Sequence, residues 1–374
     1  MKILRVSATN FKLCEDDFTI DLMPIARKMS EDLEYELQEI AENLHTFNTI
    51  VFVGKNASGK TTAAQLMALV YDIFSTFRVT DTKSFLDFNE KDLELQVHFY
   101  HEENLYYYVT TIVKEQTYIK FVDQHLYSKQ FFKSNVNEIF NLDTYSEVEI
   151  DGELPDDTSI IFKLLKKINI TGLYFPCEDA DDTIYSLIFN LYQKMSTKPQ
   201  ILDKVIKIFD EHIKSISMVL ENKFLIEYSD STKREVDSKA LFNLLSSGTT
   251  KGIGLFSVVV VSLMYGFDLV VDEIENHFHR TLVENIISLY KDKNVNKHNA
   301  TLICTTHYAE ILDLFNRSDN MYITKYDKKI FLENVYEKYK GRQDLLKSNK
   351  FYQNVFGTQV NYEALMAFKK ELMK

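Results

Sequence analysis

GKNASGKT, at residues 54–61, satisfies every fixed position of a phosphate-binding loop. The apolar run before it, residues 50–53, is typical of a buried strand, and residues 62–69 after it are typical of a helix. The motif requires this order of strand, loop and helix. We therefore interpret it as a nucleotide site rather than as a glycine-containing turn that holds no ligand.

Each part of the loop has a physical task in binding a triphosphate. Glycines let successive backbone N–H groups turn toward the phosphates, and the N-terminus of the next helix adds partial positive charge. Lys60 is predicted to reach the β- and γ-phosphates during catalysis, and the Thr61 hydroxyl to coordinate Mg²⁺. The nucleotide-binding residues predicted here are Gly54, Lys55, Asn56, Ala57, Ser58, Gly59, Lys60, Thr61 and Thr62.

Composition indicates a folded protein with a sizeable core. The 374 residues, 45% of them hydrophobic, suffice for one large domain or two ordinary ones, and only 10 Gly and 4 Pro argue against flexible linkers. Three scattered cysteines without a CxxC pair argue against a disulfide framework and fit a reducing compartment. Because we find neither a signal-peptide core nor a run of about 18 apolar residues, we expect a soluble, cytoplasmic protein without membrane contact.

The net charge of −12 opposes non-specific binding to nucleic acids and anionic membranes. The tail differs, since residues 321–374 hold 11 Lys or Arg against 6 Asp or Glu. Two interpretations stay open for this basic tail. It is either a solvated helical surface or a patch for nucleic acid or a partner protein.

Hydrophobic periodicity divides the chain into two parts. The first half predicts antiparallel hairpins at residues 1–22 and 93–113, an acidic amphipathic helix at 29–44, and two or more helices within 179–221. In the second half, apolar runs at 269–271 and 301–305 flank a helix at 282–290, which is typical of a parallel sheet covered on both faces. The nucleotide-binding core is therefore predicted to come from both ends of the sequence.

A pair of acids ends the apolar run at 269–271. Asp272 is placed to bind Mg²⁺, and Glu273 to polarise the water that attacks the γ-phosphate. Acids at a strand end are common as the start of a loop. Together with the loop at Gly54, however, they predict a complete site for ATP and Mg²⁺.

Two further segments stand at the right places in the order. LSSGT, residues 245–249, is a hydroxyl-rich turn that opens a long apolar helix, and Ser246 can either cap that helix or contribute to an anion site. His307 follows the apolar run at 301–305. A lone histidine there is usually structural, but a neighbouring strand would let its ring reach the γ-phosphate for catalysis.

In this order the chain resembles the ABC-type ATPases. GKNASGKT is similar to their Walker A motif, LSSGT to their signature, LVVDE at 269–273 to their Walker B motif with its catalytic glutamate, and His307 to their switch histidine. IENHFHR at 274–280 resembles the D-loop of stand-alone bacterial members, and the Asn10-Phe11 pair resembles their opening strand. The signature departs from the transporter pattern at Ser247 and Thr249.

The resemblance implies an α/β fold, a P-loop NTPase of ABC-ATPase head type. It implies a mixed sheet, antiparallel N-terminal hairpins with a parallel core, and a helical lobe. The corresponding division is residues 1–160 for the N-terminal core, 161–254 for the lobe, 255–335 for the C-terminal core and 336–374 for a basic helical tail. It also implies a homodimer or higher homo-oligomer, in which each ATP lies between one subunit's loop and the other's signature. Residues carried over to the composite site are Ser246, Ser247 and Gly248, residues 276–280 facing the opposite site, and Gln124 as a metal-binding glutamine-loop candidate.

Among the branches of that family, the chain most resembles the stand-alone prokaryotic AAA/OLD-like group of anti-phage defence ATPases. Lys60 and Ser246 are 186 residues apart without a sustained heptad, so a long coiled coil is not expected. The leading hypothesis is an ATPase that controls a separately encoded nuclease or toxin. The alternatives are a DNA-binding repair or maintenance ATPase that uses the basic tail, and a scaffold that binds ATP but barely hydrolyses it.

Overall fold

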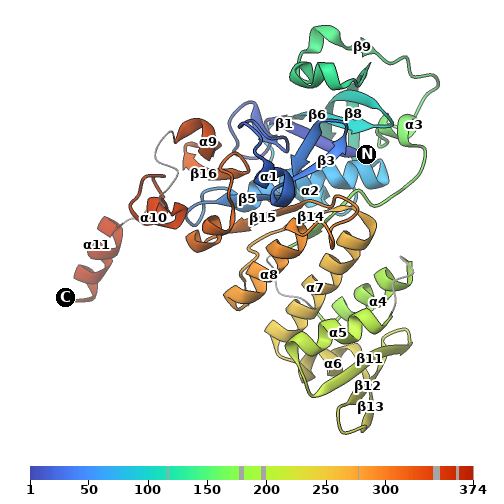
Figure 1. Cartoon of the computed structure of the whole chain (residues 1–374), viewed down its shortest axis with the longest axis vertical. Helices are drawn as coiled ribbons and strands as arrows, with labels where there is room; N and C mark the ends of the chain where they lie inside the picture. Colours follow the sequence, from blue (N-terminus) through green and yellow to red (C-terminus); the bar gives the residue numbers. More distant parts are fainter. Residues whose placement is uncertain are drawn as a thin grey trace.

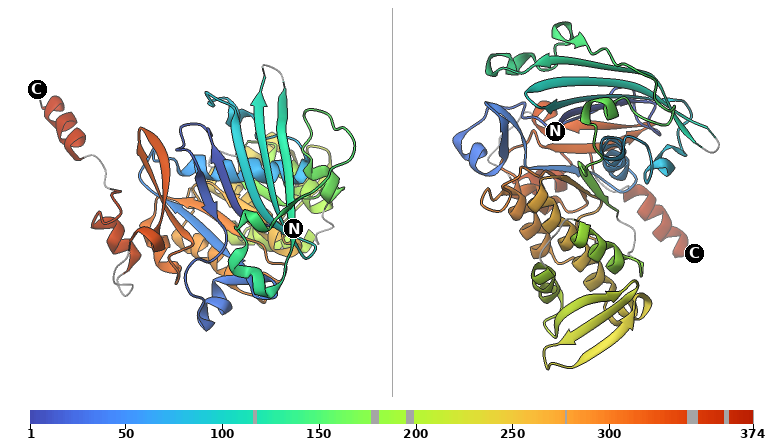
Figure 2. Two further views of the ribbon diagram at one scale, coloured as in Figure 1. Left: turned by 90° about the horizontal axis from the view of Figure 1, so that it is seen from above. Right: turned by 90° about the vertical axis from the view of Figure 1, so that its right-hand side faces the viewer.

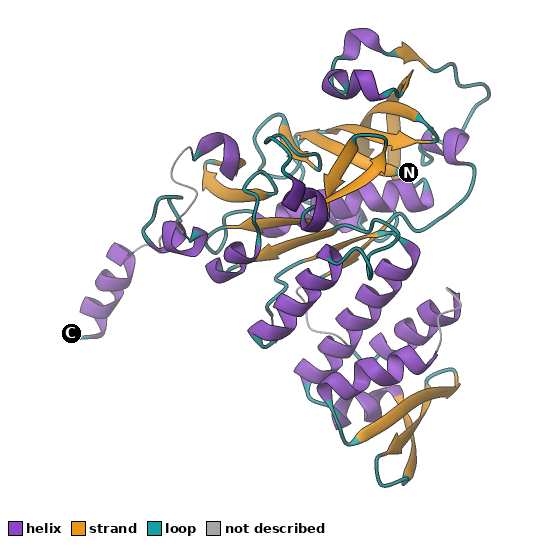
Figure 3. Cartoon of the chain, in the orientation of Figure 1, coloured by secondary structure: helices purple, strands orange, loops and turns teal. Residues whose placement is uncertain are grey.

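The computed structural model describes residues 1–115, 118–176, 181–194, 199–276, 278–339, 346–358 and 362–373. In this part of the chain, two six-stranded sheets enclose a long helix, and a lobe of helices with a small sheet extends from one side (Figures 1 and 3). The fold is thus α/β, with a P-loop between a strand and a helix of the central sheet.

The central sheet is parallel apart from its last strand. Its order is β10-β14-β15-β5-β16-β17, and β17 alone among these strands runs antiparallel to its neighbour. The strand before His307 therefore lies beside the strand before Asp272, as predicted. The strands are β5 (Thr49–Val53), β10 (Gly172–Phe175), β14 (Asp268–Val271), β15 (Leu302–Thr306), β16 (Met321–Asp327) and β17 (Lys329–Asn334).

Helices cover both faces of this sheet, and β5 shows how the sequence specifies the two faces. All five residues of β5 are buried. Ile50 and Phe52 pack in the core that contains helix α2 (Lys60–Thr76), whereas Val51 and Val53 pack in the core that contains α7 (Ser247–Tyr265) and α8 (Arg280–Lys291). The alternation follows from the two-residue period of a strand.

An antiparallel sheet packs on the other side of α2 (Figure 2). Its order is β2-β1-β6-β7-β8-β9, and the hairpins predicted at residues 1–22 and 93–113 are confirmed as β1–β2 and β6–β7. The strands are β1 (Lys2–Thr9), β2 (Phe18–Asp21), β6 (Leu93–His101), β7 (Asn104–Lys114), β8 (Ile119–Gln130) and β9 (Ser146–Glu147). Short helices in the connections are η1 (Lys83–Leu86), η2 (Lys133–Glu138), η3 (Leu142–Thr144) and α3 (Ile161–Leu165).

The lobe is built around the first half of α7. A Cβ on Gly252 would lie 2.2 Å from the ring of Phe209, so α5 approaches α7 closely there. By length and hydropathy α7 is also able to cross a membrane, but 67% of its apolar window is buried inside the structure, as in a core helix. The other lobe elements are α4 (Ile184–Lys194), α5 (Pro199–Phe209), β11 (Ile213–Leu220), β12 (Lys223–Tyr228), β13 (Lys233–Asp237) and α6 (Ser238–Leu244).

Two predicted helices are wrong in part. The helix expected at residues 29–44 is only α1 (Ser30–Tyr35). After it, β3 (Leu37–Ala41) and β4 (Leu44–Phe47) form a hairpin, whose turn is made possible by Asn43 at φ 62°. In the segment 179–221, α4 and α5 are helices as expected, but Ile213 belongs to β11. It is buried together with Ile216, and these β-branched side chains pack on the sheet instead of continuing a helix.

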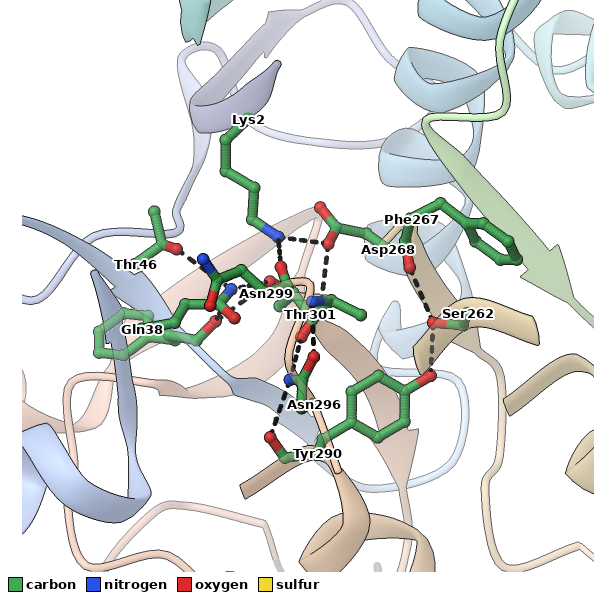
Figure 4. A network of polar contacts seen from close by, with 12 residues as sticks. Lys2, Gln38, Thr46, Ser262, Phe267, Asp268, Tyr290, Asn296, Asn299 and Thr301 are labelled. Carbon is green, nitrogen blue, oxygen red and sulfur yellow. Dashed lines mark hydrogen bonds and ion pairs between the residues drawn. The ribbon is translucent and has the colours of Figure 1, made fainter. Parts of the chain in front are cut away.

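A buried polar network anchors the start of β14, at the end of the sheet opposite the loop (Figure 4). Asp268 accepts hydrogen bonds from Lys2 Nζ at 2.6 Å, from Tyr71 Oη at 2.8 Å and from the backbone N–H of Thr301 at 2.7 Å. These donors come from β1, from α2 and from the start of β15. The network therefore fixes the Walker B-like strand relative to both sheets.

The tail begins in the core before it becomes helical. Residues 321–334 form the hairpin β16–β17, and the remaining elements are α9 (Val335–Lys338), α10 (Lys347–Tyr352) and α11 (Tyr362–Leu372). Ser348 of α10 donates from its N–H, and from its hydroxyl, to Asp313 in the 3₁₀ helix η4 (Ala309–Leu314). The tail thus packs on the segment that directly follows His307.

One histidine outside the site predicts a pH dependence of stability. The ring of His98 lies 4.4 Å from that of Tyr107, and burial, together with the charges of Arg5 and Lys129, lowers the pKa of His98 from 6.5 to about 3. Between about pH 3 and pH 6.5, His98 is therefore protonated in the unfolded chain but not in the folded chain. This contribution to stability is present above about pH 6.5 and is lost as the pH falls toward 3.

His98→Phe, which keeps a ring, should reduce the loss of unfolding free energy between pH 7 and pH 5 by about 1–2 kcal/mol. Urea unfolding at the two pH values measures this difference. His125→Phe serves as the control because that ring is exposed. An equal acid-induced loss in wild type and His98→Phe would contradict the prediction.

Candidate functional site

The phosphate-binding loop leaves the N-terminus of α2 open to an anion. Gly59 is the N-cap at a left-handed φ of 102°, and it has no side chain to bond the first N–H groups of the helix. Helix geometry gives these N–H groups no partner within α2, and its dipole adds partial positive charge. The arrangement fits a phosphate at this helix end.

The hairpin β16–β17 supports the loop from behind, which the sequence did not reveal. Ser58 Oγ lies 2.6 Å from Thr324 Oγ1, and both residues are buried. A Cβ on Gly54 would come within 2.4 Å of Thr324 Oγ1, and a Cβ on Gly59 within 2.3 Å of Ile330 Cγ2. Close packing on this hairpin therefore requires both glycines, and at Gly59 the left-handed φ of 102° requires one as well.

Lys60 lies inside the loop and faces the acids. Its Nζ donates to the carbonyl oxygens of Gly54 at 3.2 Å and of Lys55 at 3.1 Å, and only 5% of the residue is exposed. Burial lowers the pKa of Lys60, and the negative charges of Glu273, Glu275 and Asp272 oppose that shift. The carboxylates are thus near enough to favour the charged ammonium that a triphosphate requires.

Asp272 and Thr61 meet at the end of β14. The Asp272 side chain accepts hydrogen bonds from Thr61 and, at 2.6 Å, from Thr305 Oγ1, while burial raises its pKa. A hydroxyl and a carboxylate are the hard oxygen ligands that Mg²⁺ prefers, so the residues present fit this ion. Thr61 and Asp272 would hold the Mg²⁺ ion, which would neutralise charge on the phosphate oxygens.

Glu273 and His307 form a pair just beyond the carboxyl ends of β14 and β15, two neighbouring strands in the interior of the sheet. Glu273 Oε1 lies 2.8 Å from His307 Nε2, with about 30% of each side chain exposed. Glu273 has a left-handed φ of 49°, which costs a non-glycine residue free energy and must be held by its surroundings. A carboxylate beside an imidazole can take a proton from water and pass it on, as general-base catalysis requires.

Thr305 belongs to this candidate site, although the sequence did not point to it. Its buried hydroxyl accepts the N–H of Glu273 at 2.7 Å and donates to Asp272, so it holds both acids in place. Nothing in the sequence pattern distinguished it from the other apolar and hydroxyl residues of its strand. Only the pairing of β15 with β14 brings it to the acids.

The signature-like turn lies at the exposed N-terminus of α7. Ser246 is the N-cap, as one interpretation predicted, and its Oγ accepts the N–H of Thr249 at 3.0 Å. Ser246 and Ser247 are exposed, and Gly248 is half-buried. The turn therefore presents hydroxyls and a helix N-terminus on the surface of the lobe.

The structure does not bring Gln124 to this site. Its Oε1 accepts from Tyr108 Oη at 2.8 Å and from the N–H of Ile160 at 3.0 Å, which ties the following loop to strand β8. The strand that does reach this site from the middle of the chain is β10, which pairs with β14. The carbonyl oxygen of its last residue, Phe175, accepts the N–H of Asp272 at 3.0 Å. The segment after β10 begins at this edge, but residues 177–180 lie outside the described part of the chain, as does His277 of the D-loop-like segment.

Comparison with known proteins gives a family and two solved structures. Residues 50–313 match the family model described as "AAA domain, putative AbiEii toxin, Type IV TA system". The SMC head bound to the C-winged helix domain of ScpA aligns with a TM-score of 0.48 at 12% identity, covering 91% of this chain and 100% of that chain. CbiO1 from Clostridium perfringens, part of the ABC transporter complex CbiONQ, aligns with a TM-score of 0.31 at 10% identity, covering 86% and 93%. No curated protein matches the sequence.

The family match covers well over half of the chain, from β5 through η4, and includes the loop, both acids and His307. The geometry of those residues fits a nucleotide site. The chain belongs to the AAA-domain family described as putative AbiEii toxin, Type IV TA system.

Proposed function

We propose that this chain hydrolyses ATP with Glu273 as general base. The observation that carries the proposal is the 2.8 Å contact between Glu273 and His307, at the same sheet edge as the loop and Asp272. Lys60 and the N-terminus of α2 bind the phosphates. Glu273 takes a proton from the attacking water, and His307 orients Glu273 and donates to the γ-phosphate.

We further propose that two copies enclose each ATP. The exposed turn at Ser246–Gly248 supports this, because a helix N-terminus with exposed hydroxyls suits the γ-phosphate held by another subunit. Such a site is complete only in a homodimer or a larger homo-oligomer. ATP binding then drives assembly, and hydrolysis ends it.

The downstream role that we propose is control of a separate effector, a nuclease or toxin, in prokaryotic anti-phage defence. The family description names a putative toxin of a toxin–antitoxin system, which supports this class of role. The elements after Glu273, from α8 to α9, belong to the ATPase core itself.

The alternative of a DNA clamp through the basic tail has less support. Lys325 pairs with Glu333 at 2.5 Å, Lys338 with the same carboxylate group at 3.8 Å, and Lys329 with Asp16 at 3.0 Å. Lysines that are already paired offer less charge to a phosphate backbone. Lys340, a further member of the basic set, lies outside the described residues.

Mixing two inactive variants tests the composite site. Lys60→Ala removes the loop lysine, and Ser247→Glu places a negative charge where the partner's γ-phosphate would lie, without removing the Ser246 cap. Each variant alone should be inactive. A one-to-one mixture should recover about a quarter of wild-type turnover, because half of the random dimers contain one intact composite site out of two.

The matched control mixes Lys60→Ala with Glu273→Gln, since both changes affect the loop side of a site and should give no recovery. Phosphate release measures all combinations. A mixture that stays inactive, or Ser247→Glu that is active alone, would contradict the shared site without contradicting hydrolysis itself.

A further inference from the structure

Glu275 lies two residues beyond Glu273 and is buried, with 7% of the residue exposed. One of its oxygens, Oε1, accepts the backbone N–H of His307. The other, Oε2, is buried and has no hydrogen-bond partner in the described structure. A buried carboxylate therefore makes a single hydrogen bond, and it makes that bond to His307.

This arrangement is costly for stability. Burying a carboxylate disfavours folding unless hydrogen bonds or charges satisfy it, and an apolar side chain of similar volume is often neutral or stabilising in such a place. Lys60 is within electrostatic reach of Glu275, but its Nζ donates to the loop carbonyls. Packing alone does not explain a carboxylate at this position.

The hydrogen bond completes a reciprocal link between two loops. The N–H groups of Glu273 and Ile274 donate to the hydroxyl and carbonyl of Thr305, at 2.7 and 3.0 Å. In the other direction, the N–H of His307 donates to Glu275, and its ring contacts Glu273. Each loop thus holds the backbone of the other, and the left-handed Glu273 lies between these contacts.

We infer that Glu275 is a positioning residue, which fixes the backbone of His307 so that its ring meets Glu273. The inference rests on the proposed hydrolysis. Without the hydrogen bond from the His307 N–H to Glu275, the backbone at His307 is free to shift. A shift of a fraction of an ångström is enough to break the hydrogen bond between the His307 ring and Glu273. Misplacement on this scale lowers a rate by up to about 100-fold without changing substrate binding.

Two variants separate positioning from charge and from stability. Glu275→Met keeps the volume but removes the acceptor. Its kcat for ATP hydrolysis should fall by about 10- to 100-fold, with KM changed by less than about twofold. Its melting temperature should stay near that of wild type, because removing the buried charge offsets the N–H left without an acceptor. Glu275→Gln keeps an acceptor oxygen and loses the charge, so its kcat should remain within about threefold of wild type.

Hydrogen exchange supplies a readout that does not depend on turnover. The amide of His307 should exchange faster in Glu275→Met and stay protected in Glu275→Gln. A kcat unchanged in Glu275→Met, or reduced without faster exchange at His307, would overturn the inference. Equal impairment of both variants would do so too, since it would assign the effect to the charge near Lys60. If wild type itself does not hydrolyse ATP, the proposed function fails, and the exchange experiment still tests the contact.

Discussion

Glu273→Gln is expected to lower ATP turnover by about 10²- to 10⁴-fold, because it removes the group that takes a proton from the attacking water. The amide has nearly the same shape as the carboxylate and can still hydrogen-bond to His307. It is also an L-residue at the same left-handed φ of 49°, so the backbone strain is unchanged. ATP binding by Lys60 and the loop should therefore survive, and the ATP-bound assembly should accumulate.

Phosphate release measures the rate, and gel filtration with ATP measures the assembly. Glu235→Gln is the matched control, because this glutamate is exposed on β13, in the lobe. The control should behave as wild type in both measurements. Unchanged turnover in Glu273→Gln would remove Glu273 from the mechanism and leave the ATP-binding scaffold as the better explanation.

The second large effect is expected from Gly59→Ala, which should weaken ATP binding by 100-fold or more. An alanine at a left-handed φ costs roughly 1–2 kcal/mol. In addition, its Cβ would lie 2.3 Å from Ile330 Cγ2, a distance that real contacts do not show. The loop must move away from β17, which takes the N-terminus of α2 and Lys60 out of position.

Titration with a fluorescent ATP analogue measures the affinity, and thermal unfolding shows whether the variant remains folded. Gly152→Ala controls for strain alone, because its φ is +80° and its Cβ would meet only Lys163 Nζ, at 3.3 Å. Adding Ile330→Ala to Gly59→Ala should restore part of the affinity by removing the collision. Wild-type affinity in Gly59→Ala would show that the contact with Ile330 does not shape the loop.

The parts of the site that were predictable are local in sequence. The phosphate-binding loop lies within one strand, turn and helix, and the acids follow their strand directly. Periodicity also predicted the strand before His307, and the parallel order placed it beside β14. These features depend on residues that are close together in the sequence, so they can be predicted without knowing which distant segments meet.

What was missed depends on contacts between distant segments. Thr305 and Glu275 owe their roles to the pairing of β15 with β14, and Thr324 and Ile330 act on the loop from β16 and β17, more than 260 residues away. Residues 321–334 lie within the C-terminal core expected at 255–335, but their two strands, which complete the sheet, were not predicted. Similarly, residues 37–44 and 213–220 have enough helical periodicity to predict helices, but the sheets that they join override it.

The position of β5 in the sheet determines when this strand can pair during synthesis of the chain. Its two neighbours are β15, which begins at Leu302, and β16, which begins at Met321, so the P-loop strand remains unpaired until the ribosome has passed them. At ordinary elongation rates that interval is about 10–50 s. Throughout it, the nascent chain carries the uncharged segment TIVFV, whose β-forming composition favours aggregation. The cell must therefore keep β5 apart from the same segment of other nascent chains on neighbouring ribosomes until β15 and β16 have been synthesised.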